Sequence, residues 1–93
     1  MKKEIIDTYN EFIEKINQEN VIIKAPFLDI SDDELICIWD HGRSCLSKIT
    51  FELSNDKPLI KYTLTEPDMY YSKIVSNVDD LIDSFMKNYL KIS

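Results

Sequence analysis

The spacing of the apolar residues changes twice along this chain, and this change constrains the fold more than any other feature. Near the start, apolar side chains recur three and four positions apart, at Ile5, Ile6, Tyr9, Phe12, Ile13 and Ile16. The same spacing returns near the end, at Val78, Leu81, Ile82, Phe85, Met86, Tyr89 and Leu90. Both patterns are typical of amphipathic helices, so we expect a helix over residues 3–18 and another over residues 78–90.

Between these segments the apolar residues alternate with polar ones, as in strands with one wet face. Residues 49–53 and residues 60–65 both show this alternation, and residues 35–39 are apolar throughout, as in a strand covered on both faces. Residues 40–43 and 55–57 contain the Asp, Asn and Gly residues that turns favour. We therefore expect three strands joined as an antiparallel meander.

Shorter signals fill the rest of the chain. Residues 21–24 form a β-branched run before Pro26, which cannot donate to a strand ladder, so a short strand is expected to end there. Residues 29–34 are expected to form an acidic loop. Residues 66–72 are expected to form a second loop.

The last helix also carries a start signal. Ser76 is the expected N-cap, and Asp79 follows three residues later in a weaker form of the capping box.

The predicted fold is α+β: a helix, a short strand, a three-stranded antiparallel meander and a helix. We expect one domain over residues 1–93, with both helices packed on one face of the sheet.

The chain is strongly acidic, because 17 acidic and 11 basic residues give a formal net charge of −6. A nucleic-acid binder needs clustered lysines and arginines, so direct binding to nucleic acid or to an anionic membrane is not expected. The longest apolar run, residues 35–39, is far shorter than the roughly 20 residues of a membrane span, and the opening segment is amphipathic. These features predict a cytoplasmic protein.

The first predicted helix carries a row of carboxylates opposite its apolar stripe: Glu4, Asp7, Glu11 and Glu14. Neighbours in such a row lie about 5–6 Å apart, which is similar to the repeat of phosphates along a nucleic-acid strand. The row can therefore imitate a nucleic-acid backbone. The alternative is an ordinary solvated helix face, in which Lys15 pairs with Glu11.

Two further acidic groups follow. The predicted loop contributes Asp29, Asp32, Asp33 and Glu34, and the start of the last helix contributes Asp79, Asp80 and Asp83. Acids at a helix start also complement the helix dipole, and acids beside a strand are ordinary turn residues. Taken together, the three groups predict a negative field that speeds encounter with a basic protein.

The predicted loop over residues 66–72 combines Asp68 with the neighbouring tyrosines Tyr70 and Tyr71. Tyrosines are favoured as anchors at protein interfaces, so all three residues are candidates for partner binding. Packing of the tyrosines against the core is an equal alternative.

Catalytic and metal-binding patterns are weak in this sequence. His41 and Cys45 could form a base and nucleophile pair, but Asp, His and Gly are also ordinary turn residues. One histidine and two cysteines lack the short spacing of zinc sites, and the single glycine, Gly42, cannot make a phosphate-binding loop. We expect no enzyme activity, no cofactor and no metal, with Cys37 and Cys45 reduced.

In general character the chain resembles the small acidic inhibitor proteins of phages and bacteria, in particular anti-CRISPR proteins. The likeness lies in its size, its acidic first helix (Glu4 to Glu14), its acidic loop (Asp29 to Glu34) and its meander, and it includes no diagnostic motif. The resemblance implies an inhibitor that blocks the cationic groove of a nuclease or CRISPR effector by DNA mimicry or steric occlusion. One alternative is an immunity protein that neutralises a co-encoded toxin. Another is a small catalytic or metal-dependent domain centred on His41 and Cys45.

Overall fold

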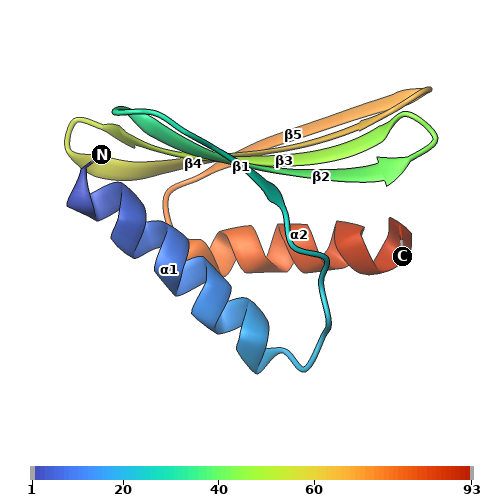
Figure 1. Cartoon of the computed structure of the whole chain (residues 1–93), viewed down its shortest axis with the longest axis horizontal. Coiled ribbons are helices and arrows are strands. Elements are labelled where there is room, and N and C mark those ends of the chain that lie inside the picture. Colours follow the sequence, from blue (N-terminus) through green and yellow to red (C-terminus); the bar gives the residue numbers. More distant parts are fainter. Residues whose placement is uncertain (1, 93) are drawn as a thin grey trace.

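The computed structural model describes residues 2–92, which form two helices and five strands (Figure 1). The elements in chain order are α1 (Lys3–Gln18), β1 (Phe27–Ile30), β2 (Glu34–Gly42), β3 (Cys45–Ser54), β4 (Lys57–Glu66), β5 (Met69–Val75) and α2 (Val78–Ile92). All strands belong to one sheet in the order β1-β2-β3-β4-β5, and each pairs antiparallel with its neighbour in the chain. The expected three-stranded meander is therefore wrong, because the meander has five strands.

The first strand lies after Pro26 rather than before it. Residues 21–24 are not in a strand, and the backbone of Lys24 is bonded to side chains instead: its N–H donates to Tyr89 Oη (2.9 Å), and its carbonyl accepts from Trp39 Nε1 (2.7 Å). Pro26 thus precedes β1, where its missing donor interrupts no ladder. The predicted strand over residues 21–24 is a connection tied to the core.

The last strand occupies most of the segment predicted as a loop. Pro67 and Asp68 form only a tight turn, after which Met69–Val75 pairs with β4 from Glu66↔Met69 to Ile60↔Val75. Most side chains of this outer strand are exposed, Tyr70 and Ile74 among them. An outer strand with few buried side chains has no clear apolar alternation, so the sequence pattern did not indicate β5.

The tight turns of the sheet depend on left-handed backbone conformations. Gly42 has a φ of 78°, and the two residues at the tip of the β2–β3 turn, Arg43 and Ser44, have φ 54° and 60°. The turn between β3 and β4 has the same form at Asn55 and Asp56, with φ 52° and 63°. Positive φ at both central residues matches the right-handed twist of the flanking strands.

The register between β2 and β3 places the two cysteines apart from each other. Cys45 pairs with Gly42, whereas Cys37 pairs with Ile49 further along the hairpin. Both thiols are free, and Cys37 is fully buried. Burial raises the pKa of Cys37 to about 12, so this thiol stays protonated.

Both helices lie on one face of the sheet (Figure 1), and aromatic side chains fill the space between them and the strands. Phe85 of α2 contacts Phe12 of α1 and Trp39 of β2, with ring centroids 5.5 and 4.9 Å apart. Within residues 2–92 no element covers the opposite face, where Ile36 and Ile38 are only half-buried. Within the described residues 2–92, neither helix is both long enough and apolar enough to cross a membrane.

The N-cap of α2 is one residue later than predicted. Asn77 Oδ1 accepts a hydrogen bond from the N–H of Asp80 (2.9 Å), and Asn77 Nδ2 donates to Asp80 Oδ2 (3.1 Å). This reciprocal pair satisfies a free N–H of the first helical turn. Ser76 lies outside the cap.

Asn77→Ala should therefore lower the free energy of unfolding by about 1 kcal/mol, the usual cost of losing an N-cap side chain. Ser76→Ala is the matched control and should change it by less than about 0.5 kcal/mol. Urea unfolding followed by circular dichroism measures both values. Equal losses for the two variants would show that the cap is misassigned.

Candidate functional site

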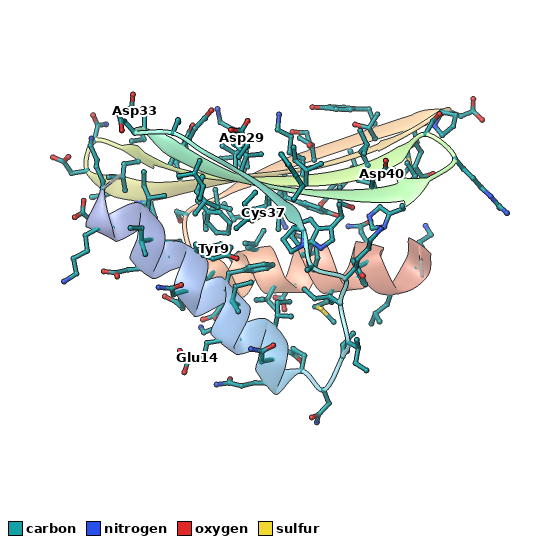
Figure 2. The ribbon with its side chains drawn as sticks, viewed as in Figure 1. Tyr9, Glu14, Asp29, Asp33, Cys37 and Asp40 are labelled. Atoms are coloured by element: carbon teal, nitrogen blue, oxygen red, sulfur yellow. The ribbon has the colours of Figure 1, made fainter. Side chains whose placement is uncertain are left out.

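The acidic row of α1 faces solvent on the side of the helix away from the sheet. Ile5, Phe12 and Ile16 are buried on the inner side of α1, while the four predicted acids are all exposed: Glu4, Asp7, Glu11 and Glu14. In Figure 2 the carboxylate of Glu14 points away from the rest of the molecule. The row is accessible along its whole length.

The start of α2 brings a second acidic group next to this row. Lys15 of α1 forms an ion pair with Asp79 of α2 and another with Glu11, at 3.3 Å from the carboxylate of Glu11. The hydrogen bond to Asp79 is the main reason that the pKa of Lys15 is raised, and Glu11 adds to the effect. Lys15 thus connects two acidic groups that are far apart in the sequence.

We call this combined region the acidic helical surface. Its carboxylates are exposed and come from α1, from the C-cap residue that follows α1, and from the start of α2: Glu4, Asp7, Glu11, Glu14, Glu19, Asp79, Asp80 and Asp83. A groove of about 460 Å³ lies between the helices on this surface, and Lys15, Glu19, Asp79 and Asp83 contribute to its lining. Sequence analysis found seven of these eight residues, all except Glu19, as separate groups on the two helices, and it gave no sign that the groups meet.

The predicted acidic loop is a β-hairpin instead. Asp29 belongs to β1, Glu34 begins β2, and Asp32 and Asp33 form the turn between them. Figure 2 shows Asp29 and Asp33 on the side of the molecule opposite Glu14. The structure therefore does not bring this group together with the acidic helical surface.

The predicted aromatic anchors differ from one another in the structure. Tyr70 is 67% exposed on the uncovered face of the sheet. Tyr71 is half-buried, packs against the core and contacts Tyr62 with ring centroids 5.9 Å apart. Asp68 is exposed in the turn before them. Tyr70 is thus accessible to a partner, whereas Tyr71 supports the core.

His41 and Cys45 line a hollow of about 760 Å³ between the β2–β3 turn, the β4–β5 turn and the end of α2. His41 Nε2 shares a hydrogen bond of 2.7 Å with Ser47 Oγ. Burial, with smaller contributions from Glu66 and Asp40, raises the pKa of Cys45, which is the opposite of the shift that a nucleophilic cysteine needs. In residues 2–92 no three His, Cys, Asp or Glu side chains gather closely enough to hold a metal ion.

Sequence analysis missed a group of exposed apolar residues around β1. Ile22 is 97% exposed and Phe27 is 69% exposed, while Ile30 follows in the same strand with 56%. A short apolar run between Pro26 and an acidic turn is a strand signal that could have found it. These residues are candidates for contact with a partner.

No protein-family model matches this chain, and neither a curated protein nor a solved structure matches it.

His41 also makes stability depend on pH. Burial lowers the pKa of His41 below its usual value of 6.5, Lys24 lowers it further, and Asp40 acts in the opposite direction. Because the folded-state pKa is the lower one, the unfolded chain binds the proton more tightly. The contribution of His41 to stability is therefore complete above pH 6.5 and is lost as the pH falls through that value toward the folded-state pKa.

We expect the free energy of unfolding to decrease more in the wild type than in His41→Gln between about pH 7.5 and about pH 5.5. Urea unfolding at the two pH values measures the difference, and the comparison cancels the titration of carboxylates common to both proteins. An identical decrease in both proteins would contradict the lowered pKa.

Proposed function

We propose that this protein is a non-catalytic inhibitor whose acidic helical surface occupies the cationic, nucleic-acid-binding groove of a nuclease, with CRISPR effectors as the first candidates. The observation that carries the proposal is the meeting of the acidic row of α1 with the acidic start of α2. Eight exposed carboxylates lie on this surface, and within residues 2–92 only Glu11 and Asp79 among them form ion pairs. Of the other six, Asp80 accepts a hydrogen bond from Asn77 in the cap of α2, and the remaining five carboxylates are exposed for pairing with a partner.

The spacing of these carboxylates suits a groove that normally holds phosphates. Neighbouring acids on a helix face lie about 5–6 Å apart, and a carboxylate accepts charge-assisted hydrogen bonds from lysine and arginine as a phosphate does. A formal net charge of −6 also speeds diffusion toward a cationic groove. Occupation of the groove by the protein excludes the nucleic acid without any chemical step.

The core holds this surface in a fixed geometry. Phe12 and Ile16 anchor α1 against the sheet, and Leu81 and Phe85 anchor α2, all four being fully or almost fully buried. A surface that is ordered before binding loses less conformational entropy when it binds. The two helices can therefore present their acids to a groove without rearrangement.

The acidic hairpin turn lies on a different part of the molecule from the acidic helical surface and has a different role in this proposal. Asp32 and Asp33 add to the negative field that steers encounter, whereas direct contact with the groove belongs to the helices. This division of roles can be tested, because the same number of charges can be reversed at either place.

The test is a triple charge reversal on α1, Glu4→Lys with Asp7→Lys and Glu14→Lys, which spares Glu11 and its pair with Lys15. Inhibition of DNA cleavage is measured with a panel of purified CRISPR nucleases and a bacterial toxin nuclease. We expect the wild type to inhibit one of them in competition with DNA, and the triple variant to inhibit it about tenfold to hundredfold less strongly. Inhibition of the toxin nuclease alone would place the same surface in an immunity protein.

The matched control reverses the same number of charges elsewhere, with Asp32→Lys, Asp33→Lys and Asp68→Lys. It should retain most of the inhibition, and both triple variants should keep the melting temperature of the wild type because all six positions are exposed. Failure to inhibit any nuclease in the panel, or equal inhibition by the two triple variants, would contradict the proposal.

A further inference from the structure

The outer edge of β1 is open and apolar. β1 pairs with β2 on one side, and no strand in residues 2–92 pairs with its other side (Figure 1). All four residues of β1 are exposed, and three of them are apolar: Phe27, Leu28 and Ile30. An exposed apolar edge strand is a template for pairing with another chain.

The register shows which backbone groups are free at this edge. The N–H of Ser31 donates to the carbonyl of Glu34 (3.0 Å), so Ser31 and Glu34 form a hydrogen-bonded pair. Hydrogen-bonded and non-hydrogen-bonded pairs alternate along an antiparallel ladder, so Asp29 bonds to β2 while Leu28 and Ile30 do not. The N–H and C=O groups of Leu28 and Ile30 therefore point outward, where an incoming strand can bond to them.

β1 contains no lysine, proline or bulge within its own residues, and its protection is limited to its short length of four residues and to Pro26, which directly precedes it. Natural edges are blocked by lysine, by proline at an outward N–H or by a bulge. β5, at the other edge of the sheet, carries Lys73. The only charge within β1 is Asp29, and its neighbours in the turn, Asp32 and Asp33, are acidic as well.

This charge discriminates between possible occupants. If two copies paired through β1 in the register that uses both outward-facing residues, Leu28 of each copy would bond to Ile30 of the other, and Asp29 would lie directly opposite Asp29. Like charges placed opposite each other destabilise a strand pair, and two acidic turns would add to the repulsion. A strand that carries lysine or arginine would instead pair favourably with Asp29.

We propose that the free edge of β1 binds an extended segment of a partner protein in which basic residues alternate with aliphatic ones. The segment adds a strand to the sheet through the backbone of Leu28 and Ile30. Its aliphatic residues lie beside the side chains of Leu28 and Ile30, which are on the helix side of the sheet. Its basic residues lie on the uncovered side, beside Asp29.

Binding at the β1 edge is a second function beside the proposed inhibition, because this edge is not part of the acidic helical surface. Figure 2 shows Asp29 and Glu14 on opposite sides of the molecule. A variant of one surface should therefore leave binding at the other intact.

The test uses the full chain and a short fluorescein-labelled peptide of alternating valine and lysine, with a peptide of alternating valine and glutamate as its control. Fluorescence anisotropy is recorded at about 0.15 M ionic strength, where charges more than about 8 Å apart are largely screened. We expect the lysine peptide to bind and the glutamate peptide not to bind. The Glu4, Asp7 and Glu14 triple variant should bind the lysine peptide within about threefold of the wild type, because it keeps the β1 edge.

Two substitutions at Ile30 distinguish the contribution of its backbone N–H to peptide binding from the contribution of its side chain. Ile30→Pro removes an outward N–H without removing a bond to β2, and it should weaken binding of the lysine peptide about tenfold because a hydrogen bond is lost and the ring obstructs the new strand. Ile30→Thr keeps the N–H and should weaken binding less than about fourfold.

If Ile30→Pro does not fold, the exposed substitution Asp29→Lys decides the question. It should weaken binding of the lysine peptide and allow the glutamate peptide to bind. The proposal would be overturned by failure of the lysine peptide to bind, by equal binding of both peptides, or by unchanged affinity in Ile30→Pro. It would also be overturned if light scattering showed self-association of the free protein that Ile30→Pro abolishes, because the occupant would then be a second copy.

Discussion

Phe85 of α2 lies against Phe12 of α1 and Trp39 of β2, and this aromatic contact ties the two ends of the chain to the same face of one sheet. A chain of 93 residues can build only one substantial core, and here both helices are used to cover that one face. The other face and both edges of the sheet consequently remain uncovered within residues 2–92. The acidic helical surface and the open β1 edge both follow from this arrangement, the first as the outer side of the helices and the second as the unpaired side of the sheet.

Elements that contribute several side chains to the core could be predicted from the sequence. The apolar spacing over residues 3–18 gave the position of α1, and Phe51 and Tyr62 lie on β3 and β4, where alternation predicted strands. The outer strands could not be predicted in this way. Few side chains of an edge strand are buried, so its sequence need not alternate apolar and polar residues. Pro26 added to the error, since a proline before a strand and a proline after one give the same local signal.

The candidate site was predictable in composition but not in arrangement. Periodicity alone shows that Glu11 lies on the outer face of a helix. The approach of Asp79 to Lys15 depends on how α1 and α2 cross, which no local pattern contains. The two tyrosines show a similar limit, because alternation indicates that Tyr70 and Tyr71 point to opposite sides of a strand only once β5 is known to exist. The free backbone groups of Leu28 and Ile30 required the register of β1 with β2.

Both proposed binding surfaces depend on the five-stranded sheet and on β1 being its open edge, and amide hydrogen exchange measured by nuclear magnetic resonance tests this arrangement most directly. We expect slow exchange throughout the centre of β3 and β4. Along β1 we expect an alternation in which the amide of Asp29 is protected while those of Leu28 and Ile30 exchange as fast as amides in an unstructured chain. Equal exchange at these three positions, or strand-like protection over residues 21–24 in place of β1, would contradict this arrangement.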